Sequence, residues 1–264
     1  MRKLLTVSHL SQRYGPITAV DNVGLALQPG QRLGLLGPQN AGKTTALQVI
    51  QGLLRPSKGK VSILGYSPAQ LPDAAHTLGC VFPGVGLPRK HTVKSYLINH
   101  QRTTGLSRDE MAAAVERFAL DPLLQRRIGS LTAGERVRVA LATATAGSPR
   151  LLLVDEPCTG LTEEEAGLLK QTLRQYVDAG GALLISGHSL PEIEDVVDDI
   201  LVIRRRCLFY GSLDELRQYG DTLNDAYLRL LQPYQDDRHI RPRTTPQTNY
   251  RLNYHSHTAW GSAA

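Results

Sequence analysis

Eight residues near the start of the chain have the types and spacing of a phosphate-binding loop. Gly37, Pro38, Gln39, Asn40, Ala41, Gly42, Lys43 and Thr44 match the pattern GxxxxGK[ST]. Glycines let the backbone wrap closely around an anion, and amides at the start of a helix point at phosphate oxygens. Lys43 is then expected to reach the β- and γ-phosphates, and the Thr44 hydroxyl to ligate Mg²⁺. A chance glycine turn is the alternative, which the flanking strand and helix patterns disfavour.

Two adjacent carboxylates, Asp155 and Glu156, directly follow the apolar run Leu151 to Val154. Open α/β sheets place their ligands at the carboxyl ends of the strands. Asp155 is suited to the magnesium shell, and Glu156 to polarising an attacking water. Two acids after a strand are by themselves more often a solvated turn. The phosphate loop upstream favours the catalytic interpretation.

Three further features are weaker signals. Thr132 and Gly134 precede a helix and fit a second anion site, although Thr132 with Glu135 fits a capping box equally well. His188 follows a buried strand, where an imidazole can donate to a γ-phosphate oxygen, yet a lone histidine is more often structural. Tyr14 can stack on adenine, but it is one of ten tyrosines.

The strand and helix patterns predict how these residues are positioned. Apolar runs from Lys3 to Leu27, broken at Tyr14-Gly15-Pro16 and Asp21-Asn22, predict paired strands. Strands that alternate with helices predict an α/β fold with a mostly parallel sheet covered on both faces. Further strands are expected at Arg32 to Leu36, Lys60 to Leu64, Leu78 to Phe82, Leu151 to Val154, Ala182 to Ser186 and within Ile200 to Tyr210, with helices at Ala41 to Leu54, Glu163 to Ala179 and Leu190 to Val197.

A helical insertion interrupts this alternation. Three helical patterns, at Thr92 to Thr103, Ser107 to Leu120 and Thr132 to Ala146, have no convincing strand between them. Four helix starts carry a hydroxyl N-cap with a glutamate three residues later, namely Ser107/Glu110, Thr162/Glu165, Ser189/Glu192 and Ser212/Glu215.

Composition places the chain among ordinary folded proteins, with 264 residues, of which 41% are hydrophobic. Its three widely spaced cysteines predict neither a disulfide framework nor a metal knuckle, which fits a reducing compartment. No apolar run approaches the roughly 20 residues of a membrane span, so we expect the protein to reach a membrane only through a partner. Residues 232–264 have almost no aliphatic side chains and are predicted to be disordered; they hold +2 of the net charge of +6, from four arginines and two aspartates.

Taken together, the motifs resemble those of the ATP-binding subunit of an ATP-binding cassette (ABC) transporter, over roughly residues 3 to 231. The resemblance extends the nucleotide loop, Walker A, to Thr45 and makes Tyr14 the adenine-stacking residue. It implies that Leu131 to Glu135 is the signature, that Asp155 and Glu156 are Walker B with the catalytic glutamate, and that His188 is the switch histidine. It also implies a P-loop NTPase core, an N-terminal antiparallel β-subdomain and a helical subdomain at about residues 85–148.

The sequence departs from the family pattern at four places. Asn40 replaces a usual glycine, which we expect the loop to tolerate because asparagine adopts left-handed conformations readily. The signature LSGGQ appears as LTAGE, so Glu135 brings negative charge near phosphates unless it caps its own helix. Gly84 stands where the family has the Q-loop glutamine, and Thr162 where it has the D-loop aspartate. We therefore expect a working but slow or partner-dependent ATPase.

The resemblance implies ATP and Mg²⁺ as ligands, a second ATP-binding subunit forming a homo- or heterodimer, and a separate membrane-spanning permease. The expected location is the cytoplasmic face of the cell membrane, and the segment from Leu223 to Leu231 favours export because it resembles the closing helix of exporter-type subunits. Two alternatives stay open at this point. One is a degenerate regulatory subunit that binds ATP beside an active partner. The other is a soluble ABC ATPase that acts on nucleic acid or ribosomes, supported only by the basic tail.

Overall fold

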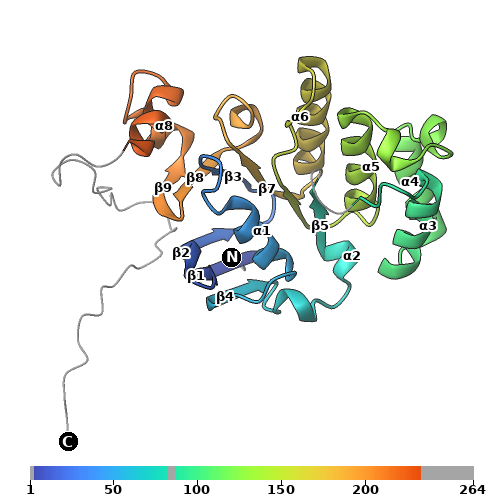
Figure 1. The fold of residues 1–264 in the computed structure, drawn as a ribbon, viewed down its shortest axis with the longest axis horizontal. Helices are drawn as coiled ribbons and strands as arrows, with labels where there is room; N and C mark the ends of the chain where they lie inside the picture. Colours follow the sequence, from blue (N-terminus) through green and yellow to red (C-terminus); the bar gives the residue numbers. More distant parts are fainter. Residues whose placement is uncertain (1–2, 83–86, 233–264) are drawn as a thin grey trace, which may run out of the picture.

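The computed structural model describes residues 3–82 and 87–232, which form two β-sheets with helices around them (Figure 1). The larger sheet has the strand order β5-β6-β7-β3-β8-β9, with all neighbours parallel except the last pair. The smaller sheet is antiparallel, in the order β2-β1-β4. The strands are β1 (Leu5–Tyr14), β2 (Ile17–Leu27), β3 (Arg32–Leu36), β4 (Lys58–Ile63), β5 (Leu78–Val81), β6 (Leu151–Val154), β7 (Ala182–Gly187), β8 (Asp199–Arg204) and β9 (Arg206–Ser212).

The helices cover both faces of the larger sheet, and α3, α4 and α5 gather at the end nearest β5 (Figure 1). The α-helices are α1 (Lys43–Gln51), α2 (Ala74–Thr77), α3 (Val93–Thr104), α4 (Arg108–Arg117), α5 (Ala133–Thr145), α6 (Glu163–Asp178), α7 (Leu213–Arg217) and α8 (Leu223–Leu231). Short 3₁₀ turns are η1 (Pro68–Gln70), η2 (Asp121–Leu123), η3 (Ile128–Ser130) and η4 (Glu194–Val196). The α/β fold with a mostly parallel sheet is as expected.

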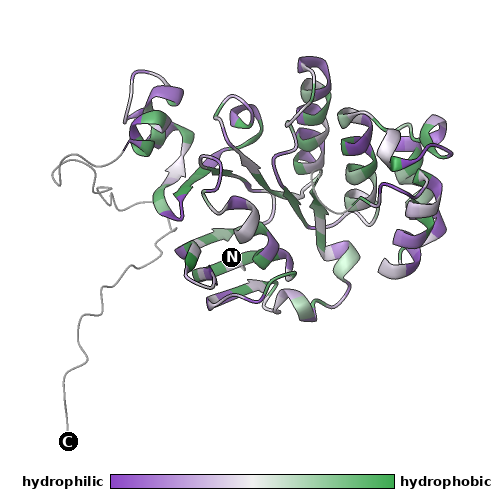
Figure 2. Cartoon of the chain, in the orientation of Figure 1, coloured by the Kyte–Doolittle hydropathy of each residue, from purple (hydrophilic) through white to green (hydrophobic). Residues whose placement is uncertain are grey.

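Two hydrophobic cores lie on opposite faces of the larger sheet, because successive side chains of a strand point to opposite sides. In β6, Leu152 and Val154 belong to the core shared with the helical elements, whereas Leu151 and Leu153 belong to the core under the smaller sheet. All four are buried. Figure 2 accordingly shows the strands of the larger sheet as predominantly hydrophobic. This packing holds the carboxyl ends of β3, β6 and β7 side by side.

The three cysteines lie in the folded part of the chain as free thiols. Burial raises the pKa of the Cys80 thiol to about 12 and that of Cys207 to about 11. Burial and the neighbouring Glu192 also raise the pKa of Cys158. The expectation that the cysteines form no disulfide framework agrees with this arrangement.

His76 connects the segment before β5 with the first turn of α4. Its Nδ1 atom lies 2.5 Å from Asp73 Oδ1, and its Nε2 atom lies 2.6 Å from Glu110 Oε1. Both hydrogen bonds raise the pKa of His76, whereas bonds from Ser107 and His76 lower the pKa of Glu110 to about 2. The imidazole, which is hydrogen-bonded at both ring nitrogens, therefore links the segment before β5 to α4.

We expect His76→Ala to lower the melting temperature by about 1–3 °C at pH 6 and by less at pH 9. A histidine whose pKa is higher in the folded state than in the unfolded state stabilises the fold. This contribution is fully present below the unfolded-state pKa of 6.5 and is lost as pH rises through the folded-state pKa. Differential scanning calorimetry across this range measures the effect. The control is His91→Ala, at an exposed position just before α3. An equal change in melting temperature at pH 6 and pH 9 would contradict a stabilising role for the charged form of His76.

Several sequence-based boundaries are wrong. Helix α1 begins at Lys43 rather than Ala41, because Gly42 has the left-handed φ of 99°. Strand β2 runs through the expected break at Asp21-Asn22, where a register shift accommodates Asn22. Helix α4 ends at Arg117, before the expected Leu120. Helix α1 also ends at Gln51, before the expected Leu54. The remaining strand and helix predictions agree with the structure to within two residues, apart from the segment after His188.

The expected helix from Leu190 to Val197 is absent, and this part of the chain forms only the 3₁₀ turn η4. The capping box expected for Ser189 and Glu192 is likewise not formed. Glu192 instead accepts the backbone amide of His188 at 3.2 Å and pairs with its imidazole. Ile193 also leaves helical geometry, with φ of −127°. The other three expected boxes are present.

Candidate nucleotide site

The phosphate loop joins β3 to α1 in a conformation that its residue types permit. Asn40 adopts the left-handed φ of 63°, which confirms that asparagine can replace glycine there. A side chain at Gly37 would meet the backbone oxygen of Ile203, and one at Gly42 would meet that of Ala19. The glycines therefore let the loop lie against the neighbouring strands. The Ala41 carbonyl oxygen accepts from the Arg205 amide at 2.8 Å, which fixes the loop to the β8–β9 turn.

Lys43 is the centre of this site, and only 4% of its surface is exposed. Its ammonium donates to the carbonyl oxygens of Gly37 (2.7 Å) and Pro38 (2.9 Å). It also lies 3.1 Å from Glu156 Oε1. The structure thus brings the loop lysine together with the expected catalytic carboxylate, although they are 113 positions apart in the sequence.

Asp155 and Thr44 form the oxygen-rich side of the site. The Thr44 hydroxyl donates to Asp155 Oδ2 at 2.8 Å. Burial raises the pKa of Asp155, and hydrogen bonds from Ser186 and Thr44 partly oppose this effect. A hydroxyl beside a carboxylate is a donor set that suits Mg²⁺, which prefers oxygen ligands and shares its shell with substrate phosphates. These two residues therefore fit the metal role expected of them.

Ser186, which the sequence reasoning missed, connects the two acids. Its buried hydroxyl donates to Asp155 Oδ1 at 2.6 Å and accepts from the Glu156 amide at 2.9 Å. Glu156 has the left-handed φ of 42°, an uncommon conformation for a residue with a side chain. Ser186 therefore holds the carboxylate of Asp155 and the backbone of Glu156 in place. A polar residue at the end of the apolar run of β7 was the available signal.

We expect Ser186→Ala to lower ATP hydrolysis about tenfold, because it leaves a partly buried carboxylate oxygen and a partly buried amide without this partner. Steady-state ATPase assays measure the effect, and thermal unfolding separates it from loss of fold. Thr145→Ala is the matched control, since it removes a buried hydroxyl bonded within α5. A Ser186→Ala protein with unchanged turnover would contradict the positioning role.

His188 follows β7 and is held by two other segments. Its Nε2 atom lies 2.9 Å from Glu192 Oε1, and its carbonyl oxygen accepts from the Tyr227 hydroxyl at 3.0 Å. Tyr227 belongs to α8 and is only 3% exposed. Helix α8 therefore anchors the backbone at His188, while the imidazole in this structure contacts Glu192. The sequence did not predict either partner.

Tyr14 lies at the end of β1, beside the turn to β2, and is 45% exposed. It pairs with Ile17, which is also exposed. Strand β2 reaches the phosphate loop at Ala19, whose backbone contacts Gly42. An exposed aromatic ring thus stands on the hairpin that borders the loop, and its adenine-stacking role stays a prediction.

Thr132 and Gly134 stand at the start of α5, which packs against β5, α3 and α4. The exposed Thr132 accepts from the Glu135 amide, and Glu135 returns the bond, so the capping-box interpretation holds. A hydroxyl that accepts still carries a proton to donate. Gly134 is buried, and a side chain there would overlap the carboxylate of Glu165. The close approach at this glycine is therefore to α6 of the same chain.

The last two of the four departures from the expected family pattern, at Thr162 and Gly84, differ in outcome. Thr162 accepts from the Glu165 amide and caps α6 through a complete capping box. It thus has a local structural role where the family has aspartate. Gly84, the position expected for the Q-loop glutamine, lies outside the described residues.

Comparison with known proteins decides the family. Residues 20–159, more than half of the chain, match the family described as "ABC transporter". This chain is a member of that family. Its members are ATPases, and the chain is accordingly an ABC-type ATPase that binds ATP. The residues expected to form Walker A, the signature and Walker B all fall inside the matched range.

Relatives over most of the chain agree with this membership. An ABC transporter ATP-binding protein NatA of Bacillus subtilis is 31% identical over 86% of this chain and 98% of its own length. A Nod factor export ATP-binding protein I of Cupriavidus metallidurans is 32% identical over 89% of this chain and 80% of its own. A zinc uptake system ATP-binding protein ZurA of Listeria monocytogenes is 27% identical over 88% of this chain and 93% of its own length.

A solved structure of an ATP-binding subunit of an ABC transporter superposes with a TM-score of 0.77. It is 26% identical and covers 87% of this ABC ATPase and all of its own chain. A second solved structure, an ATP-binding cassette in its ADP conformation, has a TM-score of 0.69 at 20% identity, which supports the fold.

Proposed function

We propose that this ABC ATPase powers export across a membrane through a separate membrane-spanning permease. The observation that carries the catalytic part is the cluster in which Lys43, Glu156, Asp155 and Thr44 meet at the ends of β3 and β6. Lys43 binds the terminal phosphates of ATP. Glu156 accepts a proton from the attacking water as general base. His188 assists by donating to the γ-phosphate after leaving Glu192.

Thr44 and Asp155 would hold Mg²⁺, and bound Mg²⁺ neutralises charge on the β- and γ-phosphates. The protein residues do the rest of the positioning. Gly37 to Thr45 cradle the phosphates, and Tyr14 stacks on adenine. We assign Thr132 and Gly134 to ATP held by a second subunit, because the Thr132 hydroxyl is exposed at the start of α5 and still has a proton to donate.

The domain organisation fits this function. Residues 1–231 act as the ABC ATP-binding domain, with a helical subdomain at about 85–148 that contains α3, α4 and α5. The tail from 232 to 264 lies outside the described residues except for Gln232. No helix in residues 3–82 and 87–232 has both the length and the apolar character needed to cross a bilayer. We place the protein on the cytoplasmic face of the membrane, bound to its permease.

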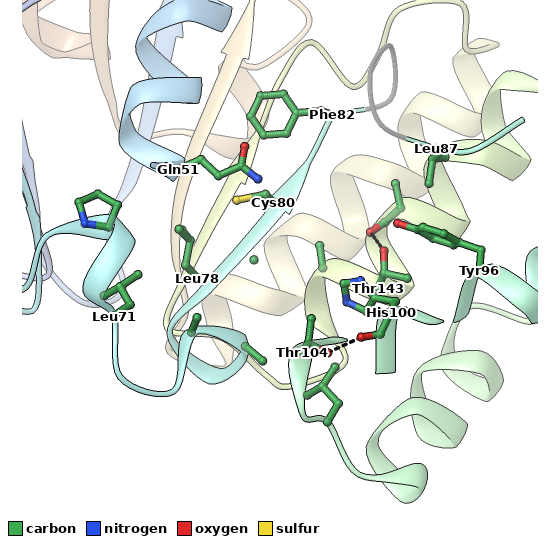
Figure 3. Close-up of a pocket in the computed structure, with 17 residues that line it drawn as sticks. Gln51, Leu71, Leu78, Cys80, Phe82, Leu87, Tyr96, His100, Thr104 and Thr143 are labelled. Atoms are coloured by element: carbon green, nitrogen blue, oxygen red, sulfur yellow. Dashed lines mark hydrogen bonds between the residues drawn. The ribbon is translucent and has the colours of Figure 1, made fainter. Parts of the chain in front are cut away.

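We propose that the permease binds at a cavity of about 340 Å³ between β5 and the helical elements. Figure 3 shows Leu78 and Cys80 of β5 on one wall, with Tyr96, His100 and Thr143 of α3 and α5 on the other. The wall on the side of β5 is largely apolar. Relatives described as Nod factor export ATP-binding proteins support the direction of transport.

Reconstitution with its membrane partner tests the function. The partner is identified by crosslinking or as the membrane protein encoded next to this chain. We expect the full chain to co-purify with that protein, and its ATPase rate to rise several-fold on association. Leu71→Arg in the wall of the cavity should weaken association at least tenfold, whereas Leu228→Arg on exposed α8 should not. ATP turnover stimulated by RNA, with no membrane partner, would instead support the soluble alternative. ATP binding without turnover in the complex would support a regulatory subunit.

A further inference from the structure

Glu135, the last residue of the signature, is bonded through both carboxylate oxygens. Oε2 accepts the Thr132 amide at 2.8 Å. Oε1 accepts Nη1 of Arg126 at 2.5 Å. The same guanidinium donates through Nη2 to the carbonyl oxygen of Ser130 at 2.8 Å. Arg126 therefore holds the loop before α5 and the acidic side chain inside α5 together.

The charge of Glu135 makes this contact important. Burial raises the pKa of Glu135, but the Thr132 amide and the Arg126 guanidinium outweigh it, and the net pKa is lowered. The side chain is thus ionised at neutral pH. An ionised carboxylate one turn from an anion-binding hydroxyl repels phosphate, and an adjacent guanidinium offsets that repulsion.

A second arginine holds the same loop without touching Glu135 in this way. Arg136 Nη1 donates to the Leu131 carbonyl oxygen at 2.6 Å. Arg126 and Arg136 thus share one kind of backbone contact, whereas the short ion pair to Glu135 belongs to Arg126. The two arginines form a natural comparison between loop support and charge neutralisation.

We propose that Arg126 is a positioning residue that neutralises Glu135, so that the signature LTAGE can approach the terminal phosphate of ATP held by a second subunit. This role rests on the proposed function of the signature. It explains how an acidic side chain is compatible with a phosphate-binding sequence. Arg126 and Glu135 act as a pair, and a neutral residue at position 135 removes the need for the arginine.

A charge-rescue experiment on the full chain tests the pair. The experiment compares three variants: Arg126→Gln, Glu135→Gln and the double variant. For each we measure the ATP affinity of the dilute protein, its ATP-driven association by light scattering, and the KM and kcat of hydrolysis. We expect Arg126→Gln to weaken ATP-driven association and to raise KM about tenfold, with kcat changed less than twofold. Glu135→Gln should lower KM modestly, because it removes a negative charge near the phosphates while glutamine can still close a capping box. The double variant should regain most of the loss.

The comparison with Arg136→Gln separates charge from loop support. Any loss caused by Arg136→Gln should persist when Glu135→Gln is added, since that arginine neutralises no charge at position 135. The proposal is overturned if the double variant Arg126→Gln/Glu135→Gln is as impaired as Arg126→Gln alone. It is also overturned if Glu135→Gln rescues Arg136→Gln as well as Arg126→Gln. Unaltered protein that binds ATP but never associates overturns the proposed two-subunit function, and this role with it.

Discussion

Replacing Glu156 by glutamine is expected to reduce ATP hydrolysis by at least a hundredfold while ATP binding is retained. A general base contributes about 10²- to 10⁴-fold to a hydrolytic step, and glutamine cannot accept the proton of the attacking water. The substitution also removes the negative partner 3.1 Å from the Lys43 ammonium. Affinity for ATP should therefore stay constant or rise. Single-turnover hydrolysis and nucleotide binding measured on the same preparation report both effects.

The control is Glu164→Gln, which makes the same chemical change at an exposed position of α6. It should leave hydrolysis within twofold of the unaltered protein. If Glu156→Gln hydrolysed ATP at a similar rate, another group would be the base. The Ser186 and Lys43 contacts would then have only a structural purpose.

Lys43→Met should weaken ATP binding about a hundredfold, because it removes a charge-assisted contact to phosphate from a buried site. Methionine keeps most of the aliphatic stem, so the loss of volume is small. The carbonyl oxygens of Gly37 and Pro38 lose their donor, which also loosens the loop. Isothermal titration with ATP in the presence of magnesium measures the affinity.

Two further variants interpret that result. Lys58→Met removes a lysine from exposed positions of β4 and should leave affinity unchanged. Lys43→Arg retains the charge but not the compact ammonium, and it should recover little of the loss. ATP affinity within threefold of normal in Lys43→Met would contradict the placement of the phosphates at this loop.

The phosphate loop could be predicted because its determinants are local. The residues from Gly37 to Thr44 are consecutive, and asparagine is a residue type that tolerates the left-handed backbone found at position 40. Asp155 and Glu156 could be predicted because a buried strand ends directly before them. The three capping boxes at Ser107, Thr162 and Ser212 are also contained within four residues each.

The failures involve contacts between distant segments. Ser189 and Glu192 have the spacing of a capping box, but Glu192 uses its carboxylate on the amide and the imidazole of His188. Ser186 joins two acids thirty positions away. No period in the sequence indicates the pairing of Tyr227 with the backbone of His188. These positions depend on which strands are neighbours in the sheet.

The raised pKa values of the three thiols have a practical consequence. At pH 7 Cys80 and Cys207 are almost wholly protonated, and only the thiolate reacts rapidly with maleimide or iodoacetamide. The native chain is therefore a quiet background for site-directed labelling. A single cysteine introduced on the exposed face of α8 should therefore label faster than Cys80 and Cys207.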